Sequence, residues 1–192
     1  QCAGERTGHV LTYADVQAAQ ARLRSVAKVT PLVYTDSISQ EAGHAVYLKC
    51  ENLQRGGAFK LRGAYNKVSA LSDAEKKRGV IAHSSGNHAI AVAYACKLLG
   101  VRAVIVIPEN AVETKVQQTL SYGAEVVRCG PTSKEREETA RALQEKHNYV
   151  LVHPFNDVLV MAGQGTAGLE IMDALPEAQA VLTPVSGGGL VS

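Results

Sequence analysis

Residues 79–108 read GVIAHSSGNHAIAVAYACKLLGVRAVIVIP and combine two apolar runs with a segment of small, helix-forming residues. The first run, Gly79 to His83, has the length of a strand, and the second, Val101 to Ile107, predicts a buried strand. Between them, Ala89 to Leu99 predicts a helix that ends at Gly100. A strand, a helix and another strand joined by short loops indicate parallel strands in one sheet.

The same alternation continues on both sides of this unit. Thr12 begins a helix, with Asp15 three residues on as an approximate capping box. We expect further strands at residues 46–50, 125–129, 149–153 and 180–185. We expect further helices at residues 59–71, 132–146 and 163–175, and another helix that follows Pro108 and ends at Tyr122.

Strands and helices that alternate in this way favour parallel sheets covered on both faces. The prediction is an α/β fold of two three-layer α/β/α domains with mostly parallel sheets. Residues 71–153 would form the smaller domain, and residues 1–70 would pack with residues 154–192 into the larger one. Functional groups in such folds gather at loops after the carboxyl ends of strands, and three loops meet that description.

The composition is that of an ordinary globular chain, with 46% hydrophobic and 20% charged residues among 192. The 20 basic and 18 acidic residues leave a net charge of +2 and are scattered, and Trp is absent. Without a basic patch or a stacking platform, nucleic acid is not an expected partner. The longest apolar runs are far shorter than the roughly 18–20 residues that span a bilayer, so no membrane anchor is expected.

The cysteines lie far apart in the sequence and form no C-x-x-C pair: Cys2, Cys50, Cys96 and Cys129. The chain also shows no signal-peptide pattern. We therefore expect reduced thiols in a cytoplasmic protein, and no metal site built from thiolates.

The first loop of interest, Ser84 to His88, lies between an expected strand and an expected helix. Backbone N–H groups at a helix N-terminus, with small hydroxyl side chains around them, suit an anion such as a carboxylate or phosphate. The alternative is an ordinary N-cap turn, in which Ser and Asn are common.

The second loop, Ser186 to Gly189, follows the last expected strand. Consecutive glycines let backbone N–H groups curl around a phosphate without obstruction by side chains. The loop lacks the Lys-Ser/Thr pair of a nucleotide-binding P-loop. The alternative interpretation is a flexible tail.

The third loop contains Gly163, Gly165 and Gly168, a literal G-x-G-x-x-G after the apolar run 158–162. Dinucleotide-binding folds also place an acidic residue about 20 positions further on, at the end of the next strand. Residues 182–185 contain no carboxylate there, so dinucleotide binding is not the expected function.

Lys60 lies at the start of an expected helix, directly after Phe59. The partial positive charge of a helix N-terminus disfavours a protonated amine, and burial would disfavour it further. Such a lysine could be a neutral nucleophile able to form a Schiff base. The alternative is a solvated surface lysine.

Taken in order, these motifs resemble one known family. The segment 51–64, ENLQRGGAFKLRGA, is similar to the cofactor-lysine segment of the fold-type II pyridoxal-phosphate enzymes, the tryptophan synthase β-like group. Four further motifs resemble its serine racemase and serine/threonine dehydratase branch: HSSGNH (83–88), HPFND (153–157), AGQGT (162–166) and SGGGL (186–190).

The resemblance implies a role for each matching residue. Lys60 would hold pyridoxal phosphate and act as acid/base on one face of the substrate carbon, with Phe59 bordering the cofactor ring. Ser85 would be the acid/base of the opposite face, and Asn87 would hydrogen-bond the 3′-oxygen of the cofactor. The expected substrate-binding residues are Ser84, Ser85, Gly86, Asn87 and His88, and the expected phosphate-binding residues are Ser186, Gly187, Gly188 and Gly189.

These roles imply racemisation of L-serine or L-threonine, β-elimination of water from either substrate to a keto acid and ammonia, or both reactions at one site. The G-x-G-x-x-G stretch would then begin a helix and serve packing. Gly56, Ala58 and Ser186 depart from the usual pattern of the family, and the first two remove hydroxyl groups near the lysine.

The resemblance also implies that family members are longer, so that this chain ends just after the phosphate loop and its larger domain is truncated at the C-terminal side. A divalent cation, Mg²⁺ or Mn²⁺, would bind in the absent part of a full-length parent, which would be a homodimer, and no metal site is expected in this chain. The alternative is a non-catalytic fragment or isoform that binds the cofactor weakly or associates with another chain.

Overall fold

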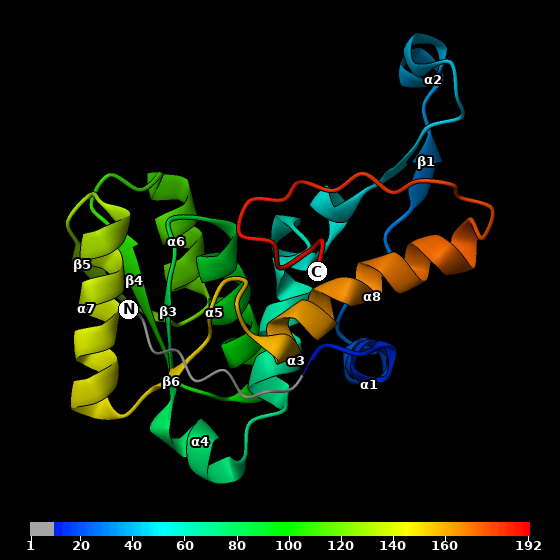
Figure 1. Cartoon of the computed structure of the whole chain (residues 1–192). Coiled ribbons are helices and arrows are strands. Elements are labelled where there is room, and N and C mark those ends of the chain that lie inside the picture. Colours follow the sequence, from blue (N-terminus) through cyan, green and yellow to red (C-terminus); the bar gives the residue numbers. More distant parts are fainter. Residues whose placement is uncertain (1–9) are drawn as a thin grey trace.

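The computed structural model describes residues 10–192, and a four-stranded parallel sheet lies at its centre (Figure 1). The strands stand in the order β5-β4-β3-β6, and each neighbouring pair is parallel. The α/β class with parallel strands is therefore confirmed. Cys2 lies among residues 1–9, outside the described part of the chain. The strands span Val80–His83 (β3), Ala103–Pro108 (β4), Glu125–Cys129 (β5) and Val150–Leu151 (β6).

Helices cover both faces of this sheet, because successive side chains of a strand point to opposite faces. Ile105 packs into the cluster that contains α5 (Asn87–Leu99), and its neighbour Val104 packs into the cluster that contains α7 (Ser133–His147). Helix α6 (Glu113–Ser121) lies beside α5 on the same face. Figure 1 shows the resulting layers, with α7 on one side of the strands and α5 on the other.

A second packing unit lies beside the sheet, where α3 (Lys60–Ser69) crosses α8 (Val158–Ala174). A Cβ on Gly163 would lie 2.4 Å from the carbonyl oxygen of Arg62, so the two backbones touch. A Cβ on Gly63 would meet Val160 O at 2.6 Å in the same way. Gly163 therefore serves the packing that the resemblance implied for the G-x-G-x-x-G stretch, and Gly63 lies on the opposite side of the same contact.

Side-chain caps define where several helices begin. Thr12 and Asp15 form the predicted capping box of α1 (Tyr13–Leu23), and Thr132 forms one with Glu135 at α7. Helix α4 (Asp73–Arg78) begins with a third capping box. These caps satisfy backbone N–H groups that the helix itself leaves unpaired.

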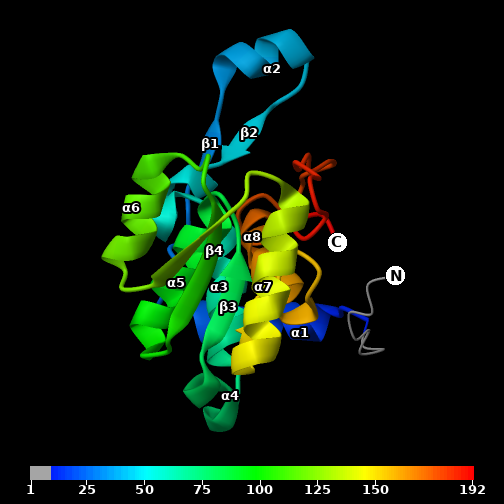
Figure 2. The ribbon, with the colours of Figure 1, turned by 90° about the vertical axis from the view of Figure 1, so that its left-hand side faces the viewer.

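An arm projects from the body of the molecule (Figure 2). Strands β1 (Leu32–Tyr34) and β2 (Tyr47–Lys49) pair antiparallel, and α2 (Asp36–Ala42) connects them at the tip. Two short 3₁₀ turns, η1 (Glu51–Leu53) and η2 (Arg55–Gly57), then lead into α3. The arm exposes large apolar side chains, namely Val33, Tyr34, Ile38, Tyr47 and Leu48.

Two sequence predictions are wrong. Residues 180–185 form no strand, and Leu182 is 95% exposed, because no strand within residues 10–192 lies beside this segment to pair with it. Helix α8 begins at Val158, before the predicted start at Gly163, because Asp157 accepts the N–H groups of Leu159 and Val160. The apolar run 158–162 is thus the first part of the helix.

The other expected elements form with small shifts at their ends, as in β2 and β6, which are shorter than predicted. No helix within residues 10–192 has the length and apolar character needed to cross a membrane. Cys50, Cys96 and Cys129 are free thiols, and burial raises the pKa of Cys96 to about 12.

Candidate active site

Lys60 is the first residue of α3, and its side chain is partly buried. The amine donates a hydrogen bond to the Pro154 carbonyl oxygen at 2.8 Å and lies 5.2 Å from the centre of the Phe59 ring. Burial lowers the pKa of Lys60 below its usual value. The structure therefore supports a lysine with increased nucleophilic character and excludes a fully solvated surface lysine.

A buried ion network holds the helix that carries Lys60. The guanidinium of Arg62, 1% exposed, donates to both carboxylate oxygens of Glu51 at 2.8 Å and to those of Glu170 at 2.7 and 2.8 Å. Burial opposes its charge, but the hydrogen bonds to the two carboxylates raise the pKa of Arg62. Lys49 joins the network through Glu170 at 2.6 Å. The start of α3 is thereby tied to η1, β2 and α8.

The loop at residues 84–86 connects β3 to α5. The Gly86 N–H donates to the Ser84 hydroxyl at 3.1 Å, and Gly86 itself is the N-cap of α5. No side chain caps this helix, and a glycine is itself common at the N-cap position. Asn87 is the first residue of α5, and the uncapped N-terminus leaves backbone donors for an anion.

His88 points away from this loop into the protein, and it is 3% exposed. Its Nε2 lies 2.9 Å from the Val152 carbonyl oxygen, which can only accept, so Nε2 carries the hydrogen. Burial, with a smaller contribution from the positive charge of Lys60, lowers the pKa of His88 to about 3. The ring is therefore neutral, and its Nδ1 is a buried acceptor that has no partner within residues 10–192.

Residues 152–157, which we call the strap, lead from β6 to α8. The strap accepts hydrogen bonds from His88 at Val152 and from Lys60 at Pro154. It thus joins two segments that the sequence analysis singled out separately, the lysine and the loop before α5.

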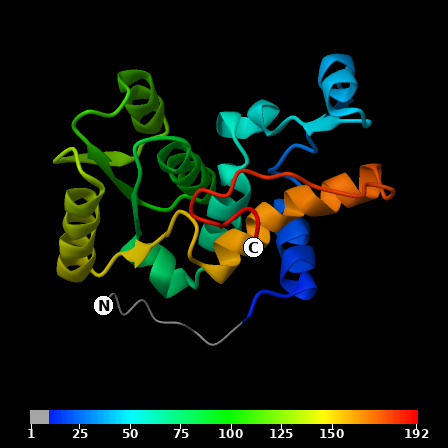
Figure 3. The same cartoon turned by 45° about the horizontal axis from the view of Figure 1, so that its top comes forward.

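The glycine loop at residues 187–189 packs on the strap. A Cβ on Gly187 would lie 2.3 Å from the Phe155 ring, and one on Gly189 would lie 2.8 Å from the Phe155 backbone. Gly188 has a φ of 90°, and Ser186 adopts a φ of 44° that side chains rarely allow. In Figures 1 and 3 the C-terminal segment runs back along α8 toward α3. The glycine loop is therefore held against the strap, which contradicts the interpretation as a free tail.

Ser85 and Gly86 line a cavity of about 390 Å³ between β4, α6 and α7. Two basic residues also line it, Lys115 of α6 and Arg136 of α7. A Cβ on Gly86 would lie 3.4 Å from the Lys115 amine, so this cation lies directly against the loop. Neither residue was predicted from the sequence, because nothing in their neighbouring residues distinguishes them from surface cations.

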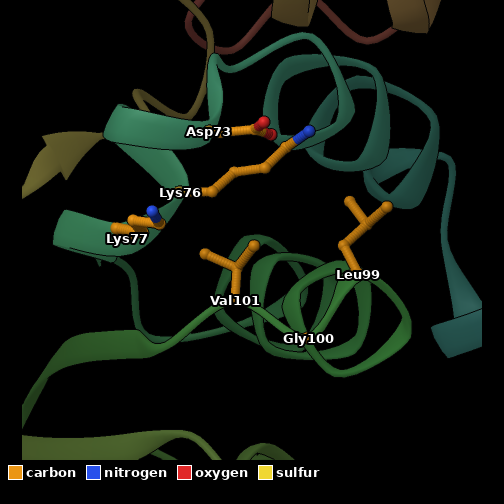
Figure 4. A pocket seen from close by; sticks show the side chains of 6 residues that line it. All are labelled: Asp73, Lys76, Lys77, Leu99, Gly100 and Val101. Atoms are coloured by element: carbon orange, nitrogen blue, oxygen red, sulfur yellow. The ribbon is translucent and has the colours of Figure 1, made fainter.

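The structure does not place Ser85 in contact with Lys60, whose amine donates to Pro154 instead. Another cavity, of about 280 Å³, lies between α4 and the end of α5 and contains none of the predicted site residues (Figure 4). Its lining residues are Asp73, Lys76, Lys77, Leu99, Gly100 and Val101.

A partly buried lysine beside a glycine loop, at the carboxyl-end loops of a parallel sheet, is typical of α/β enzymes that bind a phosphorylated cofactor. The family model described as pyridoxal-phosphate dependent enzyme matches residues 23–192. The chain therefore belongs to the family of pyridoxal-phosphate dependent enzymes, as the resemblance of its motifs predicted.

Curated relatives place it near two kinds of enzyme. It is 49% identical to the L-threonine ammonia-lyase of Thermotoga maritima, over 95% of this chain and 46% of that protein. It is 42% identical to the serine racemase of Dictyostelium discoideum, over 95% of this chain and 56% of that protein. The chain thus spans about half the length of the curated relatives it matches.

Solved structures give the same grouping. The crystal structure of serine racemase from Dictyostelium discoideum matches with a TM-score of 0.88 at 42% identity, over 94% of this chain and 59% of that one. Maize serine racemase matches with a TM-score of 0.92 at 40% identity, over 95% and 56%. The processed form of threonine deaminase isoform 2 from Solanum lycopersicum matches with a TM-score of 0.87 at 40% identity, over 93% and 48%.

Proposed function

We propose that the protein to which this chain belongs acts on small hydroxy amino acids with pyridoxal phosphate as cofactor. The reactions are racemisation of L-serine and β-elimination of water from L-serine or L-threonine, which gives a keto acid and ammonia. The observation that carries the proposal is the partly buried Lys60 amine, held by the strap that also supports the glycine loop. The named relatives support the choice of serine and threonine.

The residues present fit the cofactor. Lys60 supplies an amine whose pKa burial lowers, and Phe59 lies beside that amine. Gly187 and Gly189 lie so close to Phe155 that neither position has room for a Cβ. Their backbone N–H groups, with Ser186 and Gly188, would bind the phosphate. Asn87 would bind the 3′-oxygen. When bound, pyridoxal phosphate stabilises the carbanion that forms as the α-proton leaves.

Each proposed role follows from where the chain places the residue. The uncapped start of α5, with Ser84 and Gly86, binds the substrate carboxylate through backbone and hydroxyl donors. His88 contributes only its backbone N–H, because its ring is buried and its Nε2 donates to the Val152 carbonyl oxygen. Lys60 moves the α-proton on one face, and the Ser85 hydroxyl moves it on the other when the product is the D-isomer.

The test uses the whole protein with L-serine and L-threonine, and it follows keto acid and D-serine formation. We expect Lys60→Ala to lower both activities by about 10²–10⁴-fold, because it removes the acid/base and the cofactor attachment. Lys77→Ala, at an exposed lysine of α4, is the matched control. Visible absorbance of cofactor bound in Lys60→Ala as in the wild type would contradict the attachment.

Ser85 separates the two reactions. Ser85→Ala is expected to reduce racemisation by about 10²-fold while the elimination from L-serine changes by less than about tenfold, because only racemisation needs a second acid/base. Equal losses in both reactions would contradict the role of Ser85 on the opposite face. The alternative of a non-catalytic chain predicts no keto acid from any variant, and the matches to serine racemases and threonine ammonia-lyases do not favour it.

We further propose that the whole protein is a cytoplasmic homodimer with two domains, divided as the sequence analysis predicts. The free thiols and the exposed apolar side chains of the arm support this. A divalent cation, Mg²⁺ or Mn²⁺, stays a prediction for the whole protein, since no group of three metal-ligating side chains occurs within residues 10–192. Mass measurement in solution tests the dimer.

A further inference from the structure

The strap contains the motif His-Pro-Phe-Asn-Asp, whose side chains take no direct part in the proposed reaction. His88, in turn, enters the proposed site only through its backbone. His88 is 3% exposed, and the hydrogen bond from its Nε2 to the Val152 carbonyl oxygen at 2.9 Å joins it to the strap. This contact fixes the tautomer of the ring, because the carbonyl oxygen needs a donor.

The strap is held at its other end as well. His153 Nδ1 accepts the N–H groups of Phe155 at 3.2 Å and Asn156 at 2.8 Å, which closes a tight turn. Asp157 caps α8 and forms an ion pair of 2.7 Å with Lys67 of α3. The strap is thus anchored at Val152 and at Asp157. Between these residues, the Pro154 carbonyl oxygen accepts the hydrogen bond from the Lys60 amine.

Val152 is held twice, since its N–H donates to the Ile81 carbonyl oxygen at 2.9 Å and its carbonyl oxygen accepts from His88. Loss of the His88 bond would free that carbonyl and, with it, the residues that follow Val152. Val152 lies two positions before Pro154, whose carbonyl oxygen accepts the Lys60 amine at 2.8 Å. Phe155 follows at once and supports Gly187 and Gly189. A shift of the strap at Val152 would reach both the lysine and the glycine loop, because His153 and Pro154 restrict the backbone between them.

We propose that His88 is a positioning residue for Lys60. Its hydrogen bond to Val152 holds the strap so that Pro154 directs the lysine amine and Phe155 supports the glycine loop. The position of the amine follows from the contacts alone, and only the benefit for catalysis rests on the proposed function.

The test measures Lys60 in the whole protein without cofactor. Trace acetylation with acetic anhydride at several pH values gives the reactivity of the Lys60 amine, with the exposed Lys77 of the same molecule as reference. Amide hydrogen exchange at Phe155 and Asn156 reports on the strap, because both donate to His153. Three variants are compared: His88→Leu removes the donor, His88→Asn shortens it, and His88→Gln retains an N–H donor.

We expect His88→Leu and His88→Asn to speed exchange at Phe155 and Asn156 by about tenfold and to shift the pH profile of Lys60 acetylation toward that of Lys77. His88→Gln is expected to restore most of both signals. His44→Leu, at an exposed histidine, is the control and should change neither. When the cofactor is added, its visible band should form more slowly in the first two variants.

Protected amides in β3 and β4 show that a variant is folded. The proposal is overturned if a folded His88→Leu or His88→Asn has the same exchange rates at Phe155 and Asn156 and the same Lys60 reactivity as the wild type. It is also overturned if His88→Gln, folded, behaves like His88→Leu. Neither readout needs substrate, so an absence of serine or threonine turnover would count against the proposed function and leave this result readable.

Discussion

Glycines gather in two places of this chain, in α8 and in the loop at residues 187–189, and they meet different neighbours. In α8, Gly163 lies against the backbone of Arg62 at the crossing with α3. In the loop, Gly187 lies against the ring of Phe155, which is 37% exposed. Backbone atoms cannot move aside, whereas an exposed ring can turn.

The difference separates stability from function. The α3–α8 crossing is a closed contact of backbone atoms with a buried ion network, so changes there should unfold the protein. The glycine loop and the strap form the edge of the proposed site, so changes there should alter ligand binding first. A literal G-x-G-x-x-G therefore belongs to packing here and not to nucleotide binding.

The largest effect is expected at the crossing, from Arg62→Leu. The substitution leaves the Glu51 and Glu170 carboxylates without the guanidinium that pairs with them, which costs about 3–5 kcal/mol of unfolding free energy. Denaturant unfolding measures it. Arg102→Leu, which breaks an exposed pair with Glu125, is the control and should leave the free energy of unfolding nearly unchanged, because solvent screens that pair. Similar losses in both variants would show that the network does not hold the crossing.

The pH dependence of stability should show that the His88 ring, which anchors the strap, is buried and neutral in the folded protein. The pKa of His88 falls from 6.5 to about 3, so the unfolded chain binds a proton that the folded protein does not. Its stabilising contribution is complete above pH 6.5 and is lost as the pH falls toward 3, by about 1.4 kcal/mol per pH unit. Subtracting the pH profile of unfolding free energy of His88→Gln from that of the wild type isolates the contribution of His88. Parallel profiles would show that the pKa of His88 is not lowered in the folded protein.

Gly163→Ala is expected to cost about 2–3 kcal/mol, because the new Cβ would lie 2.4 Å from the carbonyl oxygen of Arg62 and force α3 and α8 apart. Thermal or denaturant unfolding gives the value. Gly168→Ala is the matched control in the same helix, with nothing within 4 Å of its Cβ. It should instead stabilise the protein by about 0.5–1 kcal/mol through helix propensity. If Gly163→Ala is as stable as the wild type, α3 and α8 can move apart at little cost, which would contradict a closed contact.

The smallest change in stability is expected from Gly187→Ala, below about 1 kcal/mol, because the Phe155 ring can move away from the new methyl group. The same movement should disturb the phosphate cradle and weaken binding of pyridoxal phosphate by about tenfold, or about 1.4 kcal/mol. Fluorescence or absorbance titration of the whole protein with the cofactor tests this. Unchanged binding would remove the loop from the proposed site.

Much of the fold was predictable from local pattern. The segment 79–108 forms a strand, a helix and a strand as expected, because its apolar runs and Gly100 agree with the structure that the sheet imposes. The capping box of Thr12 and Asp15 was equally local. The strand expected at residues 180–185 failed because a strand needs a neighbour, and no local signal records whether one is present.

The site divides in the same way. Lys60, the loop before α5 and the glycine loop were predicted as site residues from residue type and spacing. Lys115 and Arg136 were missed, since their position beside Ser85 comes from the packing of α6 and α7 on the sheet. The role of Pro154 was equally hidden, because its carbonyl oxygen is a backbone group that every residue carries.

The sequence by itself therefore determined the class of fold, the order of most elements and the family, since periodicity, caps and motifs are local chemistry. Only the tertiary structure decided that Gly163 belongs to a helix crossing and that the strap joins His88, Lys60 and the glycine loop. The physical reason is that such contacts join residues far apart in the chain. Their geometry exists only once α3, α5 and α8 have packed together.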